Sequence, residues 1–245
     1  MHEPSSTHLF RAKDGAPLAS QFTTRWTIIR ALHGKEREAA WQWFVERYRP
    51  FVRGILAMTL PRPDLVQAAE EEFWGYAWMS GALQRADGER RFRAFLSGVV
   101  RNFGRAFSRK RGLLVADEAS LATVRADDGT RSEINLWVEN VVSNALTALR
   151  AEHTGMAQAV MLFYGLSPEP RQSRPLTAAE VATSMGNTTQ GVYMLLFRGR
   201  KRLRKLVEEE LREGCGDAQT LTEELQALLG IASANVPGLL AVGPW

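Results

Sequence analysis

The chain has 245 residues, of which 45% are apolar and 24% are charged, a balance typical of globular proteins. This length suffices for one large domain or two small ones. The formal net charge is only +4, but two separate basic patches, Arg101 to Arg111 and Arg198 to Lys205, favour a polyanionic partner. The single cysteine excludes an intrachain disulfide. The sequence shows no metal-ligand spacing, secretory signal or membrane-spanning apolar run. We therefore expect a cytoplasmic protein with no membrane insertion, no metal and no cofactor.

Apolar spacing predicts an all-α fold with few or no strands, because helical periodicity dominates and alternation is absent. Residues 1–21 are polar, and we expect them to be disordered. Helices are predicted within 23–58, where Pro50 either kinks the helix or starts a new one. A second helical stretch covers 64–83, and a strongly amphipathic helix covers 92–107.

The C-terminal half continues the helical pattern after a less ordered stretch. Residues 112–133 contain few aromatic and several acidic residues, which is typical of a flexible interdomain linker. Residues 134–163 are predicted to be helical. A short tail helix is expected near 221–229, with Thr220 and Glu223 as its capping box.

The segment from 176 to 211 carries the strongest functional signal. Thr177 and Glu180 form a Thr-x-x-Glu capping box, which satisfies free amides at a helix start. That helix is expected to end at Met185, followed by Gly186, which adopts positive φ at little cost. Two helices joined by such a turn make a helix-turn-helix.

The second helix of this pair combines a core stripe with a basic cluster. Asn187, Thr188 and Thr189 are candidate N-caps. The stripe consists of Val192, Leu195, Leu196, Leu203, Leu206 and Val207. Six basic residues lie within eight positions: Arg198, Arg200, Lys201, Arg202, Arg204 and Lys205. Such a cluster suits phosphate contacts, although basic residues also complement the dipole at a helix end in any two-helix hairpin.

Taken together, these features suggest a family. The relevant motifs are Phe22-Thr23-Thr24-Arg25-Trp26, the run from Ala86 to Leu96 with Asn102, the stretch from Glu180 to Leu206, and the tail from Glu223 to Leu229. In this order they resemble bacterial RNA polymerase sigma factors of the extracytoplasmic-function group, and within it a planctomycete-type subfamily. The resemblance covers roughly residues 22 to 230.

The resemblance implies a two-domain transcription initiation factor. Residues 22–111 would form the promoter-melting (−10) and polymerase-binding domain, and 112–133 the acidic linker through the polymerase cleft. Residues 134–211 would form the helix-turn-helix (−35) domain, and 212–245 a C-terminal tail with a short helix. The implied partners are the β′ and β subunits of core RNA polymerase and promoter DNA. An anti-sigma or other regulatory protein is a further candidate partner.

Promoter melting requires the protein to bind unstacked bases and the backbone of the single strand. The resemblance assigns this role to the loop before the basic helix and to that helix. The candidate residues are Gln84, Arg85, Asp87, Arg93, Arg101, Asn102, Arg105 and Arg109. Arg101, Arg105 and Arg109 recur every four residues and therefore share one helix face. A plain surface loop and a solvated helix face remain the alternative.

The polymerase-binding helix has two possible alignments with the family. One places the contacts at Glu70, Glu71, Glu72, Phe73 and Trp74, since acidic and aromatic residues suit an interface with a β′ coiled coil. The other matches Asp64-Leu65-Val66-Gln67 to an Asp-Leu-x-Gln signature. The two alignments exclude each other. Burial in the core explains Phe73 and Trp74 equally well.

Duplex contacts are assigned to the second helix of the helix-turn-helix, whose N-terminal end enters the major groove. The candidates are Asn187, Thr188, Thr189, Gln190, Tyr193, Arg198, Arg200, Lys201 and Arg202. Gln190 can pair with adenine, and threonine can meet a thymine methyl group. Tyr193 and Phe197 depart from the basic residue and histidine usual in the family, so they either enlarge the core or form a partner surface. One hypothesis is that promoter choice depends partly on another protein.

No enzyme signature is present, and the four histidines are scattered, so we expect no catalytic residues. The competing hypothesis is a standalone helix-turn-helix regulator whose first domain is a sensor or a dimerisation unit. A third is a factor that titrates polymerase without reading DNA.

Overall fold

The fold is all-α, as the sequence predicts. The computed structural model describes residues 32, 37–85, 92–112, 126–166, 174–212, 215 and 217–240, with the backbone alone at 84–85 and 126–132. No strand occurs within these ranges, and none of their helices is both long and apolar enough to cross a membrane. Contacts divide the chain into two compact units, with the boundary after Thr130. Residues 1–21, which are predicted to be disordered, and residues 113–125 of the predicted linker lie outside the described residues.

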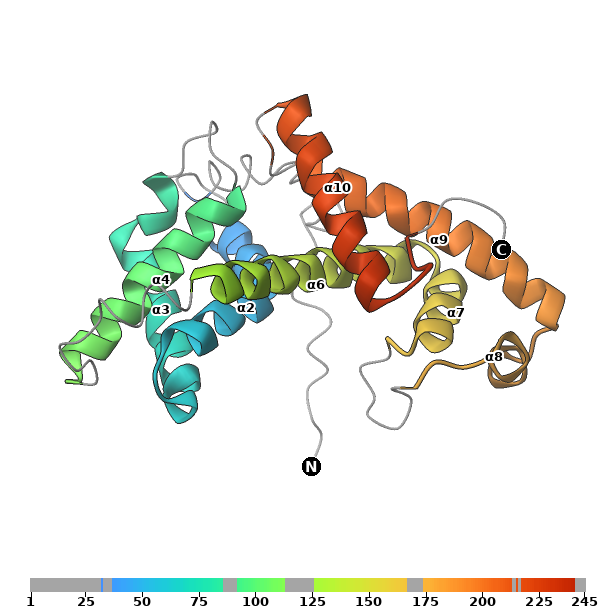
Figure 1. Cartoon of the computed structure of the whole chain (residues 1–245), viewed down its shortest axis with the longest axis horizontal. Coiled ribbons are helices and arrows are strands. Elements are labelled where there is room, and N and C mark those ends of the chain that lie inside the picture. The colour runs from blue at the N-terminus through green and yellow to red at the C-terminus, as the bar shows by residue number, and fades with distance from the viewer. Residues whose placement is uncertain are drawn as a thin grey trace. The chain divides into compact units, whose positions relative to one another are not determined.

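Among the residues that the structure describes in the first unit, three α-helices pack on one another. They are α2 (Arg37–Thr59), α3 (Val66–Ser80) and α4 (Phe92–Lys110), and α2 lies against both of the others (Figure 1). Two short 3-10 helices, η3 (Pro63–Leu65) and η4 (Ala82–Arg85), flank α3. Helical spacing predicts six apolar residues on one face of α4. Phe92, Leu96 and Phe107 of this set are buried, whereas Phe95, Val99 and Phe103 are half-buried.

The core of the first unit is aromatic. Phe44, Tyr48, Phe51, Phe73 and Phe92 are all 1% exposed or less. The ring centroids of Phe44 and Tyr48 lie 4.8 Å apart, and those of Tyr48 and Phe92 lie 5.3 Å apart. Aromatic rings bury large apolar areas and gain further from tilted and edge-to-face contacts, so this cluster fixes how α4 sits on α2.

Pro50 lies inside α2 and starts no new helix. The helix is continuous from Arg37 to Thr59, although proline removes one backbone hydrogen bond. Phe51, Val52 and Ile55, just after Pro50, are fully buried. Their burial outweighs the missing bond, which is why one of the two predicted alternatives is wrong.

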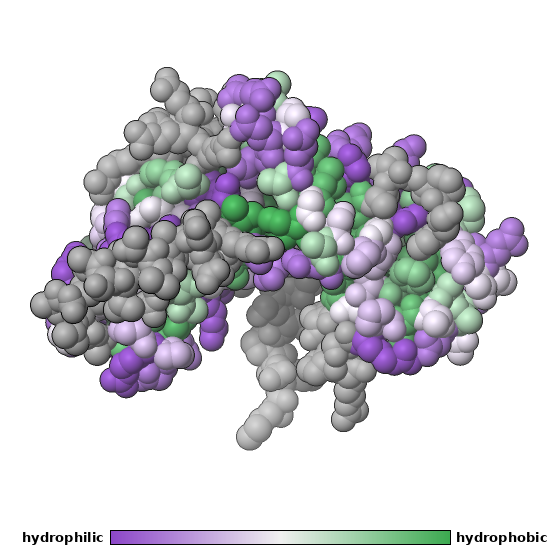
Figure 2. All heavy atoms as spheres, in the orientation of Figure 1, coloured by the Kyte–Doolittle hydropathy of each residue, from purple (hydrophilic) through white to green (hydrophobic). Residues whose placement is uncertain are grey.

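The part of the second unit that the structure describes contains five α-helices. They are α6 (Ala126–Glu152), α7 (Thr154–Tyr164), α8 (Ala178–Met185), α9 (Thr189–Arg212) and α10 (Ala218–Asn235). Helix α9 packs on α7, α8 and α10 (Figure 1). In the space-filling view, apolar side chains gather around α7 (Figure 2).

Three helix boundaries differ from the predicted ones. Helix α6 begins at Ala126 rather than Ile134, so residues 126–133 of the predicted linker are helical. The predicted helix 134–163 breaks at His153, whose φ of −146° and ψ of 78° are not helical. The tail helix is longer than predicted and starts at Asp217, whose carboxylate accepts from the Thr220 N–H at 2.8 Å. The predicted Thr220–Glu223 capping box is therefore wrong.

Gly199 permits the close crossing of α7 and α9. A Cβ at this position would lie 3.0 Å from Val160 Cγ2 and 3.3 Å from the Met156 carbonyl oxygen. Both neighbours belong to α7, and a backbone oxygen cannot move without disturbing its own helix. A residue with no side chain is therefore required for α9 to pack at this depth.

Candidate nucleic-acid interface

The turn between α8 and α9 is held by local side-chain bonds. The Thr177 hydroxyl accepts from the Glu180 N–H at 3.3 Å, and the Glu180 carboxylate accepts from the Thr177 N–H at 2.8 Å, which confirms the capping box. Gly186 ends α8 with a φ of +61°, a conformation that favours glycine. The direction in which α9 leaves this turn is thus fixed by a few neighbouring residues.

Helix α9 is capped by Thr188. Its hydroxyl oxygen accepts from the Gly191 N–H at 3.0 Å, and its own N–H donates to Asn187 Oδ1 at 2.7 Å. Asn187 and Thr188 are both predicted to contact DNA. One hydrogen-bonding oxygen of each is used instead to cap the start of α9. The next residues, Thr189 and Gln190, are exposed.

The exposed face of α9 carries polar, apolar and basic residues in succession. Its members recur at intervals of three and four positions, so they project from the same side. They are Gln190, Tyr193, Met194, Phe197, Arg198 and Lys201, and all are exposed. Tyr193 and Phe197 are therefore not core residues, which removes one of the two predicted alternatives for them.

The basic cluster of α9 is divided between surface and interior. Arg198 and Lys201 are exposed, and no ion pair to either occurs within the described part of the chain. Arg200 is only 4% exposed, and its guanidinium donates to the Gly238 carbonyl at 3.3 Å. The sequence-based assignment of Arg200 to DNA is thus corrected: it holds the C-terminal segment.

Arg202 and Arg204 are also engaged within the protein. The Arg202 guanidinium donates to both carboxylate oxygens of Glu152 at 2.6 and 2.7 Å. These bonds hold the pKa of Glu152 below its ordinary value. Arg204 bonds Glu208 and donates to the Leu240 carbonyl at 3.2 Å. Of the predicted phosphate contacts Arg198, Arg200, Lys201 and Arg202, the exposed ones are therefore Arg198 and Lys201.

A second set of cations lies on α4. Arg105 and Arg109 are exposed, one turn apart, with no ion pair to either among the residues described. Asn102 is exposed, whereas Arg93 and Arg101 are half-buried. The exposed members of the predicted line of arginines are thus Arg105 and Arg109, at the C-terminal end of α4.

The predicted base-capture loop falls mostly outside the described residues. Gln84 and Arg85 lie in η4, but their side chains are not described, and Asp87 is not described at all. Their assignment stays a prediction.

The predicted polymerase-binding residues of α3 do not form one exposed patch. Phe73 is fully buried, and Glu70 is 5% exposed beside Arg49 and Arg53, at 3.6 and 3.9 Å. Glu71 and Glu72 are exposed, and Glu72 pairs with Arg111 at 2.6 Å. Glu70 and Phe73 are therefore corrected to interior positions, because helical periodicity turns them toward α2 and α4.

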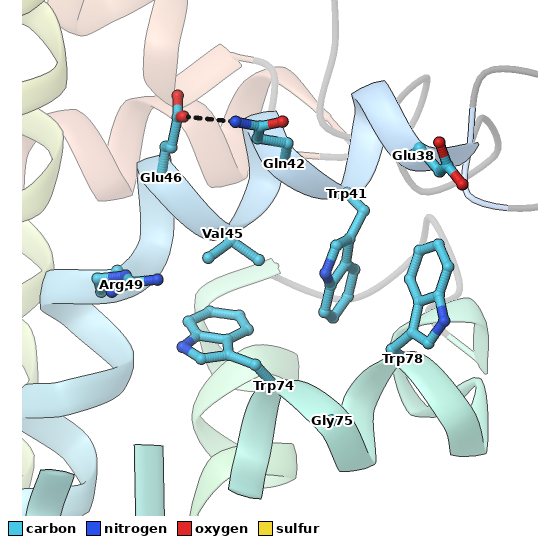
Figure 3. A pocket seen from close by; sticks show the side chains of 9 residues that line it. All are labelled: Glu38, Trp41, Gln42, Val45, Glu46, Arg49, Trp74, Gly75 and Trp78. Carbon is cyan, nitrogen blue, oxygen red and sulfur yellow. Dashed lines mark hydrogen bonds between the residues drawn. The ribbon is translucent and has the colours of Figure 1, made fainter. Parts of the chain in front are cut away.

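Trp74 instead lines a groove of about 570 Å³ between α2 and α3 (Figure 3). The Trp41 ring projects from α2 between Trp74 and Trp78, with ring centroids 5.9 and 5.2 Å away. Glu38 and Glu46 of α2 also line the groove. The sequence-based assignment missed Trp41 and Trp78, although the spacing of Trp74 and Trp78 by four residues was a signal.

Comparisons with protein-family models, curated proteins and solved structures found no match to this chain. The evidence for a function therefore comes from the side chains of this chain alone. Among the described residues, no group of three or more histidine, cysteine or acidic side chains is placed to hold a metal ion.

Glu180 provides a test of the α8 cap. Hydrogen bonds from Arg174 and then from Thr177 lower the pKa of Glu180 from 4.5 to about 2. A carboxyl group whose pKa is lower in the folded state stabilises the fold above its unfolded pKa, and this contribution disappears as pH falls through the folded value. We expect Glu180→Gln to destabilise the protein near neutral pH, and the difference from wild type to narrow between pH 4.5 and about 2. Urea denaturation followed by circular dichroism measures it, and a constant difference would contradict the role of the charge.

Proposed function

We propose that this protein is a sigma-type initiation factor that binds core RNA polymerase, recognises promoter DNA and promotes strand opening. In this proposal the two units act as a −10 domain and a −35 domain in the cytoplasm. The α8–α9 pair acts as a helix-turn-helix. The observation that carries the proposal is the exposed, cation-bearing face of α9 that directly follows a capped helix and a tight glycine turn.

Duplex binding is supported by the geometry of that pair. A recognition helix must present its first turns to the major groove while the preceding helix stays outside. The first three turns of α9 are exposed along one face, and Val192 and Leu196 on the opposite face are fully buried. Arg198 and Lys201 stand where they can meet phosphates on the groove edge.

Strand opening is supported by α4. Single strands are held by basic side chains along the backbone together with stacking surfaces for bases. Arg105 and Arg109 supply exposed positive charge, and the exposed Asn102 supplies a hydrogen-bonding side chain close by. The buried aromatic face of the same helix keeps these groups in fixed positions.

Polymerase binding is best supported at the N-terminal part of α3 and the adjacent groove. Asp64, Gln67 and Glu71 are exposed, whereas Glu70 and Phe73 are buried. This exposure favours the Asp64–Gln67 alignment over the one centred on Glu70 to Trp74. The tryptophan groove adds an apolar surface of the kind that anchors protein interfaces.

Run-off transcription with purified core polymerase on fragmented genomic DNA tests the proposal. We expect the full chain to co-purify with core enzyme and to direct starts at discrete sites. Duplex binding without association with core enzyme would instead favour a standalone regulator. Association with core enzyme but silence on every template would favour a factor that titrates polymerase.

A further inference from the structure

The exposed face of α9 contains an apolar patch where base-reading side chains are expected. Tyr193, Met194 and Phe197 are 44%, 48% and 45% exposed. They are among the few large apolar residues that the described part of the chain exposes to this degree. Adjacent exposed apolar residues on one helix face commonly mark a binding surface.

The neighbouring polar groups leave few hydrogen-bonding base readers. Asn187 Oδ1 accepts from the Thr188 N–H, and the Thr188 hydroxyl accepts from the Gly191 N–H. On the exposed face, the amide of Gln190 precedes the apolar patch and the cations of Arg198 and Lys201 follow it. Most of the surface between Gln190 and Arg198 is therefore apolar, with the phenol hydroxyl of Tyr193 as a polar group within the patch.

Charge complementarity identifies the occupant as nucleic acid. Arg198 directly follows Phe197, and Lys201 lies one turn beyond, on the same exposed face. The acidic residues of α9, Glu208, Glu209 and Glu210, lie more than a turn farther along, and ion pairs join Glu208 to Arg204 and Glu209 to Arg202. An apolar patch bordered by exposed cations suits a partner with apolar groups flanked by phosphates.

The major groove of DNA offers one strongly apolar group, the C5-methyl of thymine. We propose that Tyr193, Met194 and Phe197 read thymine methyl groups, so that α9 selects thymine-containing steps by van der Waals contact more than by hydrogen bonds. This inference rests on the proposed function, because it requires α9 to enter the groove. Arg198 and Lys201 then hold the flanking phosphates and set the register.

Replacing thymine by uracil isolates the methyl group, since the two bases pair identically. Duplexes would be selected from a randomised pool with the full chain bound to core polymerase. The selected duplex would then be synthesised with thymine or with deoxyuridine in the protected −35 region. We expect about a threefold to fourfold loss of affinity for each contacted methyl group that is removed. Deoxyuridine outside the protected region is the matched control.

A variant that lacks two of the proposed apolar contacts tests the same interaction from the protein side. In Tyr193→Ala/Phe197→Ala, both changes are at exposed positions, and we expect the affinity advantage of the thymine duplex over the uracil duplex to fall to the part that Met194 alone supplies. Lys201→Ala serves as the comparison: it should weaken both duplexes equally and lower the salt dependence of binding by about one counterion.

Each outcome decides between the alternatives. Equal wild-type affinity for thymine and uracil duplexes would overturn methyl readout while leaving promoter binding intact. Loss of association with core polymerase by the double variant, with the preference for thymine duplexes retained, would show that the patch contacts protein, and would also overturn the inference. If no duplex is enriched and every template stays silent, the proposed function itself fails, and the inference fails with it.

Discussion

Replacing Arg105 and Arg109 together by alanine is expected to slow promoter opening by roughly tenfold to a hundredfold, because the proposed function assigns these two side chains to phosphates of the melted strand. Both side chains are exposed, and no ion pair to either occurs in the described residues, so their removal breaks no internal contact of that kind. The melting temperature should therefore stay within about 2 °C of wild type, as is usual for surface substitutions. Permanganate reactivity of unpaired thymines measures open-complex formation directly.

A matched variant separates local contacts from net charge. Arg150→Ala/Arg212→Ala removes the same charge from two exposed positions at the ends of α6 and α9. We expect it to open promoters at nearly the wild-type rate. A template with a premelted −10 region should restore much of the rate of the α4 variant. If the α4 variant opens duplex promoters normally, α4 does not hold the melted strand.

Local features of the fold were predictable from the sequence. The capping box of α8 depends on Thr177 and Glu180, three residues apart, and the turn depends on Gly186 alone. The apolar face of α4 follows from helical spacing, and three of its six predicted members, Phe92, Leu96 and Phe107, are buried. Interactions confined to one or two turns are encoded in short sequence patterns, so reading them requires no knowledge of the tertiary structure.

The division of the basic cluster was not predictable, because it depends on residues far along the chain. Arg202 pairs with Glu152, 50 positions away, and Arg200 donates to Gly238, 38 positions away. A run of arginines reads as uniformly exposed until the partners that bury some of them are known. The tail segment with Leu239 and Leu240, 2% and 3% exposed, thus decides which cations remain on the surface.

The tryptophan groove illustrates the same limit. Trp41 and Trp78 come from different helices, and only the packing of α2 on α3 brings their rings within 5.2 Å. The structure places both half-buried rings at the lining of a groove (Figure 3).

Gly199→Val is expected to destabilise the second unit by about 3 kcal/mol, because the new side chain overlaps Val160 Cγ2 and the Met156 carbonyl of α7. Gly230→Val is the matched control: Gly230 lies in α10, and a Cβ there would meet nothing within 4 Å. Its effect should stay within about 0.5 kcal/mol, as for surface substitutions away from special features. The two variants introduce the same side chain into helices of the same unit, so their difference isolates the crossing of α7 and α9.

Hydrogen exchange followed by mass spectrometry on the full chain resolves where the loss occurs, since local opening is reported peptide by peptide. In Gly199→Val, peptides from α7 and α9 should exchange faster, whereas those from α2, α3 and α4 should keep wild-type protection. Because α7 supports the buried face of α9, the exposed face would no longer be held in one orientation, and promoter duplex affinity should fall together with protection. Normal protection of α7 and α9 in this variant would mean that the close crossing is not what holds the exposed face of α9 in position.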